Sequence, residues 1–209
     1  MNILLFGATG PTGQQIVKQA LGQGHRVTAF VRRPEALART DGDLQIVSGD
    51  VTQDRSNVAE AMVGQELVIS ALGRGTSFRS DQLMSRSMGV IVPAMAQAGV
   101  RRMILMSSFG VGESRRDAPL ILGIMFRVLL RDVFADKKSA EEELRGSGLD
   151  WTIVHPVLLT NGPLTGRYRA AERLDLHGMP KISRADVAHF ILAEAENRAY
   201  VRKVAVISY

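Results

Sequence analysis

The chain has 209 residues, 45% of them hydrophobic, 22% charged and 5% aromatic, which is too apolar for a disordered chain and too charged for a membrane bundle. The length fits one α/β domain over residues 1–209, and the absence of cysteine excludes disulfides and thiolate metal sites, so we expect no metal. The net charge of +5 is spread through the chain as basic pairs rather than gathered in a tail, so we expect neither a nucleic acid nor a membrane as a partner.

The start, MNILLFGATG, lacks the basic region, long apolar run and cleavage site of a signal peptide, which favours a cytoplasmic protein. Apolar runs then alternate with helical patterns along almost the whole chain. The runs predict buried strands over Asn2–Phe6, His25–Val31, Leu44–Ser48, Leu67–Ala71, Met103–Ser107, Trp151–Val154 and Lys203–Ser208. The helical patterns cover Thr12–Gln23, Asp54–Val63, Asp81–Ala98, Leu120–Arg145 and Arg184–Glu196. This alternation predicts a Rossmann fold, a doubly wound parallel sheet with helices on both faces.

One segment breaks the alternation. Residues 157–181 are rich in glycine and proline and carry no regular hydrophobic period. We expect them to form an irregular substrate flap above the carboxyl edge of the sheet, where folds of this class bind ligands. Ser183 and Asp186 then mark the start of the last helix.

A glycine-rich turn follows the first predicted strand and opens the first predicted helix, with the spacing G-x-x-G-x-x-G. Missing Cβ atoms let the backbone turn sharply and approach a pyrophosphate, which the free N–H groups at the helix start can bind. A tight structural turn could use the same glycines. In this strand–turn–helix context the motif predicts dinucleotide binding by Gly7, Thr9, Gly10, Pro11, Thr12 and Gly13.

The end of the second strand indicates which dinucleotide binds. An NAD-binding chain offers a carboxylate to the ribose about 20 residues past the glycine motif. Arg32 and Arg33 stand there instead. Arginine can pair with a 2′-phosphate in a bidentate way, whereas an acid would repel it. Arginines at a strand end could be merely solvated, but their place favours NADP(H) over NAD(H).

Two further strand ends fit the same ligand. Asp50 could accept a hydrogen bond from the adenine amino group, with Val51 against the ring, or Asp50 could be the N-cap of the next helix. Leu72 and Gly73 close the fourth strand, where the backbone would pass close to the cofactor. Arg74 could reach a phosphate or only solvent.

The strand-end motifs resemble those of the atypical short-chain dehydrogenase/reductases of the NAD(P)H-binding, NmrA-like group. The segments Gly162–Tyr168 and Ile182–Phe190 are similar to matching segments of the flavin reductases, which include the biliverdin-IXβ reductases. The resemblance implies a monomeric NADPH-dependent reductase of flavins and linear tetrapyrroles, with a small-molecule electron acceptor as its partner. A flavin would then be a substrate and not a prosthetic group.

The resemblance also implies site residues. Ser108 corresponds to the active-site serine of the family, whereas the family's active-site histidine is replaced by Leu158; the nearest histidine is His155. The remaining residues that the resemblance places along the cofactor, beyond the glycine turn and Arg32, are Asp50, Val51, Leu72, Gly73, Met84 and Met106. Further candidates for contact with the cofactor are Pro156, Leu158 and Leu159.

The reaction chemistry needs few groups. The Tyr-x-x-x-Lys pair of alcohol dehydrogenases is missing, because Val133 and Phe134 precede Lys137 and Lys138 by four residues. Flavin reduction does not need that acid, since the reduced ring can take its proton from water and the protein supplies stacking and orientation. Candidate substrate walls are Phe109, Leu158, Leu159, Leu164 and Tyr168, each of which could instead be a packing residue.

Three side-chain groups remain open. His155 could donate a hydrogen bond to substrate, but a histidine at a strand end is more often structural, and we take Ser108 and His155 as the catalytic candidates. Glu141–Glu143 is interpreted as a solvated helix face, because adjacent carboxylates do not converge on one site. Asp136 and Lys137 read as an ordinary surface pair or as residues that shape the pocket.

A function of another class is also open: an NmrA-like sensor that binds NADP(H) without turnover. The short chain and the expected flap favour the enzyme, since a sensor would carry an added interaction surface. The hypothesis of an isomerase or epimerase of the extended short-chain type is weakened, because no substrate domain follows the predicted sheet.

Overall fold

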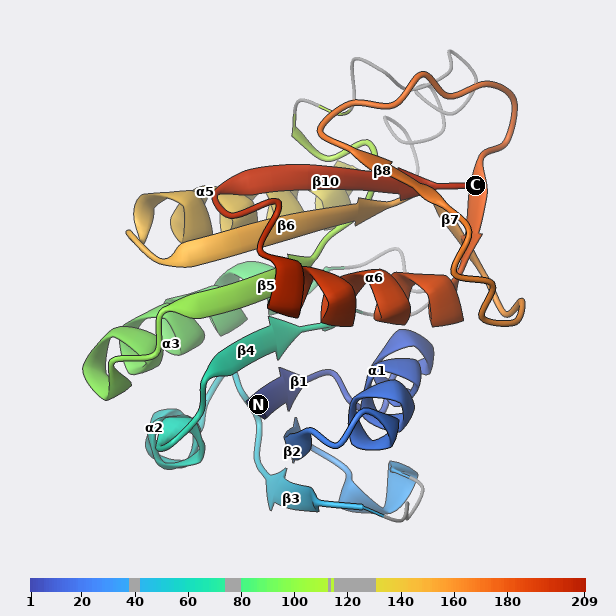
Figure 1. Ribbon diagram of the computed structural model, residues 1–209. Coiled ribbons are helices and arrows are strands. Elements are labelled where there is room, and N and C mark those ends of the chain that lie inside the picture. Colours follow the sequence, from blue (N-terminus) through green and yellow to red (C-terminus); the bar gives the residue numbers. More distant parts are fainter. Residues whose placement is uncertain (38–41, 74–79, 113, 115–130) are drawn as a thin grey trace.

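The computed structural model describes residues 1–209 except 38–41, 74–79, 113 and 115–130. Eight strands form one sheet in the order β3-β2-β1-β4-β5-β6-β10-β8 (Figure 1). Every neighbouring pair is parallel except β10 and the short edge strand β8, which run antiparallel. The strands are β1 (Asn2–Phe6), β2 (Arg26–Val31), β3 (Leu44–Ser48), β4 (Leu67–Ser70), β5 (Arg102–Met106), β6 (Asp150–Pro156), β8 (Arg169–Ala171) and β10 (Lys203–Ser208).

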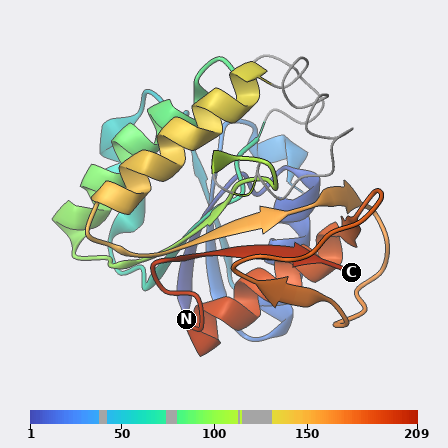
Figure 2. The same ribbon diagram turned by 90° about the horizontal axis from the view of Figure 1, so that it is seen from above.

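Helices cover both faces of this sheet. On one face α1 (Pro11–Gly22) packs against α6 (Arg184–Asn197); on the other α3 (Leu83–Ala98) packs between α2 (Arg55–Met62) and α5 (Arg131–Gly146), as Figure 2 shows for α3 and α5 opposite α6. A short 3₁₀ helix, η1 (Pro34–Ala36), follows β2. The expected doubly wound α/β fold is confirmed, although positions 120–130 of the helix expected over Leu120–Arg145 lie outside the described residues. None of the described helices is both long enough and apolar enough to cross a lipid bilayer.

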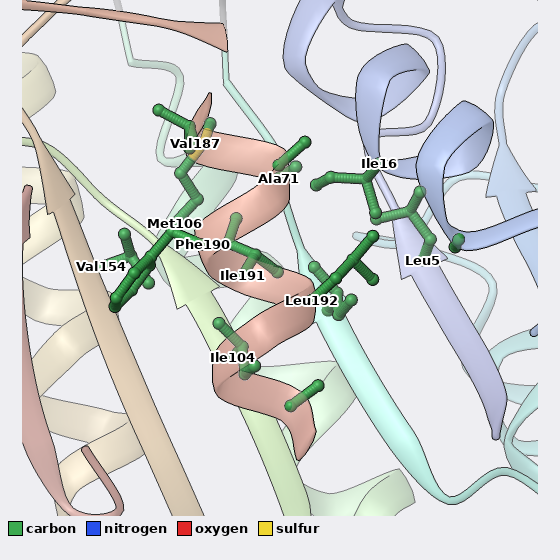
Figure 3. Packing of buried hydrophobic residues seen from close by; sticks show 14 of the residues in the cluster. Leu5, Ile16, Ala71, Ile104, Met106, Val154, Val187, Phe190, Ile191 and Leu192 are labelled. Atoms are coloured by element: carbon green, nitrogen blue, oxygen red, sulfur yellow. The ribbon is translucent and has the colours of Figure 1, made fainter. Parts of the chain in front are cut away.

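The sheet is buried on both faces, which explains its continuous apolar strands. In β1, Ile3 and Leu5 join the cluster under α1 and α6, while Leu4 and Phe6 join the cluster under α2, α3 and α5. Figure 3 shows part of the first cluster, in which α6 lies over one face of the sheet. Because side chains alternate across a strand, each apolar residue of β1 contributes to one of two cores.

Helix ends follow the expected local chemistry. Gly99 closes α3 in the left-handed conformation with a φ of 71°, which glycine adopts without a Cβ clash. Ser183 caps α6, its hydroxyl accepting a hydrogen bond of 2.9 Å from the Asp186 backbone N–H. Pro93 lies inside α3, and the helix continues past it to Ala98.

The segment 157–181, expected to be irregular, is in part regular. It contains β7 (Leu158–Thr160) and the edge strand β8, and β7 pairs in parallel with β9 (Lys181–Ser183). The Asp186 carboxylate holds the loop between β7 and β8 by accepting hydrogen bonds from the N–H groups of Thr165 at 2.9 Å and Gly166 at 2.8 Å. The motif at the start of α6 therefore fixes the conformation of the flap, because it satisfies backbone donors that the loop itself cannot pair.

Candidate functional site

The glycine turn lies at the carboxyl edge of the sheet, between β1 and β4, where the strand order reverses. Gly7 has a φ of 86° and follows β1 directly. A Cβ on Gly7 would lie 2.6 Å from the carbonyl carbon of Ala71, just beyond β4. Only glycine can hold the turn this close to its neighbour, and the crevice at such a reversal is where α/β sheets bind ligands.

The turn leads into α1 with a geometry that suits a bound anion. Gly10 precedes the helix, Pro11 occupies its first position, and no side chain among the described residues caps the first turn. A Cβ on Gly13 would lie 2.1 Å from the carbonyl oxygen of Gly7. The first N–H groups of a helix have no intrahelical acceptor, so those of Thr12 and Gly13 are free for a ligand. The turn fits the pyrophosphate of a dinucleotide.

The neighbouring strand ends provide charges for the adenosine half of such a ligand. Arg32 and Arg33 are exposed just past β2. The Asp50 carboxylate accepts hydrogen bonds from the Thr52 backbone N–H at 2.9 Å and from the Thr52 hydroxyl at 2.8 Å. The bond from the Thr52 N–H lowers the pKa of Asp50, and the nearby positive charges of Arg32 and Arg86 act in the same direction. Asp50 is therefore a negatively charged carboxylate that interacts electrostatically with the positive charge of Arg32.

Asp50 is not the N-cap of α2, which corrects one of its two expected roles. Asp54 precedes the helix instead, and its carboxylate accepts a hydrogen bond of 2.5 Å from the Asp50 backbone N–H. Six residues, 49–54, separate the end of β3 from the start of α2, so Asp50 lies within the intervening turn. Val51 is buried in the core cluster that contains Phe6 and Phe30.

The ends of β4 and β5 lie beside the turn. Leu72 is half-buried and Gly73 is exposed; a Cβ on Gly73 would meet no described atom within 4 Å. Met84 and Met106 are buried in the two cores, so they lie beneath this edge, with little surface for a ligand. Arg74 lies outside the described residues.

Ser108 follows β5 at the same edge and contacts a lysine from α5. The Lys137 ammonium donates a short hydrogen bond to the Ser108 hydroxyl and a second one, of 3.3 Å, to the Ser107 carbonyl. Ser108 is half-buried. Burial lowers the pKa of Lys137 to about 8, although the negative charges of Glu141 and Asp136 act in the opposite direction. This lysine is part of the site rather than of a surface pair.

A buried polar network lies directly behind Ser108. Glu141 accepts hydrogen bonds from the Ser107 hydroxyl at 2.5 Å and contacts His155 Nε2 at 2.8 Å, and the other ring nitrogen of His155 lies 3.0 Å from the Ser114 hydroxyl. His155 is 1% exposed and Glu141 3%. Both ring nitrogens of the buried His155 are engaged by Glu141 and Ser114, which leaves neither of them to donate to a substrate.

The expectation that Glu141–Glu143 is a solvated face is thus wrong for Glu141. On α5, Asp136, Ala140, Glu141 and Leu144 are buried together, and their spacing of three and four residues marks one side of a helix. Asp136 accepts hydrogen bonds from the N–H groups of Met84 at 3.0 Å and Ser85 at 2.9 Å. That spacing was the signal that the sequence offered for a polar site on this helix.

The other residues expected to line the cofactor or the substrate are either engaged in packing and hydrogen bonds or exposed. Phe109 is buried in the core, Pro156 is buried at the end of β6, and Leu159 packs against the core. The Tyr168 hydroxyl lies 2.7 Å from His189 Nδ1, and the Tyr168 ring meets Phe190 edge-on. The free apolar side chains of the flap include Leu158 and Leu164, which are more than half exposed.

Removing the carboxylate of Glu141 is expected to destabilise the fold. Glu141→Ala leaves the buried His155 and Ser107 without their acceptor, which costs about 1–3 kcal/mol for each group left unsatisfied. Glu142→Ala is the matched control, since Glu142 is exposed and pairs with Lys138 at the surface. Urea unfolding measures both variants, and equal losses of unfolding free energy would show that the Glu141 network is solvated.

Comparisons with known proteins found a family model, relatives and solved structures that are similar to this chain. The family model described as NAD(P)H-binding matches residues 7–198. An uncharacterized chloroplastic protein of Arabidopsis thaliana is 33% identical over 78% of this chain and 61% of its own length. A Bacillus subtilis protein named an uncharacterized sugar epimerase is 29% identical over 96% of this chain and 92% of its own. The solved structure of ChuY, described as an anaerobilin reductase of Escherichia coli O157:H7, has a TM-score of 0.81, is 30% identical and covers 99% of this chain and 96% of that one.

Proposed function

The chain belongs to the NAD(P)H-binding family, an atypical short-chain dehydrogenase/reductase group, and from that premise we propose that it is an NADPH-dependent reductase that passes a hydride to a flavin or a similar conjugated acceptor. The observation that carries the proposal is the half-buried Ser108, hydrogen-bonded to Lys137 at the same sheet edge as the glycine turn. The likeness to a protein described as a reductase supports it.

The residues at the carboxyl edge would hold NADPH in an extended form across the sheet. The free N–H groups at the start of α1 would bind its pyrophosphate. Arg32, at the end of β2, would pair with the 2′-phosphate, and Asp50 would accept a hydrogen bond from adenine. The nicotinamide end would then lie toward β5 and Ser108, because the ligand crosses from β2 past β1 and β4.

The chain contributes orientation and exclusion of water more than covalent chemistry. When bound, NADPH supplies a hydride from its nicotinamide ring. The Ser108 hydroxyl would orient the nicotinamide or the acceptor by hydrogen bonding. The exposed side chains of Leu158 and Leu164 on the flap would cover the flat face of a conjugated acceptor, which shields the transfer from solvent.

Mixing the purified protein with NADPH and FMN tests the proposed reaction. We expect NADPH to be oxidised, which is measured as a loss of its ultraviolet absorbance. Tight NADPH binding without oxidation in the presence of FMN and of other conjugated acceptors would contradict the reductase and favour the sensor.

The coenzyme preference is expected to depend on Arg32. Arg32→Glu would replace an attraction to the 2′-phosphate by a repulsion, so we expect the affinity for NADPH to fall by about 10- to 100-fold, since a hydrogen bond to a charged group contributes about 1.5–3 kcal/mol. The affinity for NADH should change little. Calorimetric titration of both coenzymes measures the ratio, with Lys18→Glu as the control because Lys18 makes the same charge change on the exposed face of α1. If Arg32→Glu left the ratio of the NADPH and NADH affinities unchanged, the proposed preference for NADPH would be contradicted.

A further inference from the structure

Lys137 differs from the other site residues because its partners are neutral. Its ammonium donates to the Ser108 hydroxyl and the Ser107 carbonyl. Among the described residues no carboxylate oxygen forms an ion pair with it. The two acids whose charges act on it are engaged elsewhere, Asp136 with the backbone at the start of α3 and Glu141 with His155 and Ser107.

This arrangement matters because an unpaired ammonium can lose its proton easily. Desolvation disfavours the charged form of a lysine, whereas a salt bridge would hold the proton in place. Burial brings the pKa of Lys137 to about 8, and the charges that oppose this fall come from Asp136 and Glu141. The lysine can therefore release and regain a proton near neutral pH. Its hydrogen bond to Ser108 gives that proton a path to the open edge of the site.

We propose that Lys137 and Ser108 form a proton-delivery pair, which makes the preferred acceptor a conjugated carbon system whose reduction needs a proton as well as a hydride. This inference rests on the proposed reductase function. The chain lacks the tyrosine that would normally be the acid, since Val133 stands four residues before Lys137. The serine takes that place, and Lys137 supplies its proton.

The proposed step moves one hydride and one proton to the acceptor. The acceptor gains a hydride, which is two electrons and a proton, from NADPH, and its conjugated system becomes an anion at a nitrogen or oxygen atom. The Ser108 hydroxyl gives its proton to that atom as the new N–H or O–H bond forms, and the Lys137 ammonium gives a proton to the serine oxygen. Lys137 is left as a neutral amine, which regains a proton from water after the product leaves. A linear tetrapyrrole needs this second proton, whereas a reduced flavin can take its proton from water.

The first test does not depend on turnover. In protein with ¹³C-labelled lysine, the signals of the carbon next to each ammonium report the titration of each side chain by NMR, and the signal missing from Lys137→Arg belongs to Lys137. We expect one lysine that titrates near pH 8, in the absence of any acceptor. Titration of that signal near the ordinary lysine pKa of about 10.4 would overturn the proposal.

The second test compares two acceptors, biliverdin and FMN, and takes the ratio of their turnover rates. We expect Lys137→Met and Lys137→Arg to lower the biliverdin-to-FMN ratio by about 100-fold, since general acids contribute about 10²- to 10⁴-fold. Arginine keeps the charge and the hydrogen bond but cannot release its proton. Biliverdin turnover by the unaltered protein should fall about tenfold per pH unit above pH 8, and the arginine variant should lack this fall.

Lys138→Met is the matched control, because Lys138 is the exposed neighbour that pairs with Glu142, and it should leave the ratio unchanged. A ratio retained by Lys137→Arg, or an equal loss for both acceptors, would show that Lys137 only positions the site and would overturn the proposal. If neither acceptor oxidises NADPH in the unaltered protein, the proposed function fails, and the NMR titration still decides whether Lys137 holds a mobile proton.

Discussion

Replacing Gly13 by alanine is expected to lower the free energy of unfolding by about 3 kcal/mol and to weaken NADPH binding by about 100-fold. The new Cβ would lie 2.1 Å from the Gly7 carbonyl oxygen and 2.8 Å from the Ala8 Cα. Both atoms belong to the backbone, so no change of side-chain rotamer can relieve the contact. The turn must open instead, and the N–H groups at the start of α1 lose the positions in which they would bind a pyrophosphate.

Thermal denaturation and calorimetric titration with NADPH measure the two effects. Gly22→Ala is the control within the same helix, since a Cβ there meets no described atom within 4 Å. Alanine is favoured over glycine in a helix by up to about 1 kcal/mol, so this variant should be as stable as the parent or more stable. If Gly13→Ala kept the parent's NADPH affinity, the turn would not be the pyrophosphate site.

The fold could be predicted because the apolar pattern and the turns agree along the chain. The strands Asn2–Phe6 and Leu44–Ser48 begin and end as expected, and α1 and α3 differ by one or two residues at their ends. A parallel sheet needs both faces covered, so its strands are continuous apolar runs that stand out from the helices. The glycine turn could also be predicted from local sequence. The spacing of its glycines follows from the close approach of the turn's backbone to itself and to the residue after β4.

The polar half of the site was not predictable in the same way. Glu141 stands in a run of three glutamates, and local spacing alone made that run a solvated face. Its burial depends on the packing of α5 against α3 and on the side chains that β5 and β6 present at their ends, Ser107 and His155. Only the assembled sheet brings these residues together, because they are separated by up to 48 positions in the sequence.

The flap illustrates a third case, in which resemblance located a motif without its physical reason. The sequence around Asp186 resembles the matching segment of flavin reductases. The structure supplies the reason, since the Asp186 carboxylate binds two backbone N–H groups of the flap and accepts a hydrogen bond of 2.7 Å from the Tyr209 hydroxyl. A carboxylate that joins the loop, the helix start and the last residue cannot be identified from local patterns.

Glu194→Ala is expected to lower the free energy of unfolding by about 3–5 kcal/mol, since it leaves a buried charge without its partner. Glu194 Oε1 lies 2.8 Å from Arg102 Nη2, and the two side chains are 1% and 5% exposed. The same carboxylate accepts hydrogen bonds from the Thr152 hydroxyl and from the N–H groups of Ala199 and Tyr200, each at 3.0 Å. The variant therefore loses one ion pair and the acceptor of three hydrogen bonds at once.

Urea unfolding measures the loss, and Glu196→Ala is the control on the same helix because the Glu196 side chain is 60% exposed. That exposed change should cost less than about 1 kcal/mol. Arg102 is the first residue of β5, so the pair lies at the opposite end of that strand from Ser108. The folded fraction of Glu194→Ala should thus bind NADPH with the parent's affinity, although less of it is folded. A weakened NADPH affinity in that fraction would mean that the two ends of the sheet are coupled. A loss of less than about 1 kcal/mol in the free energy of unfolding would mean that Arg102 becomes hydrated when Glu194 is removed.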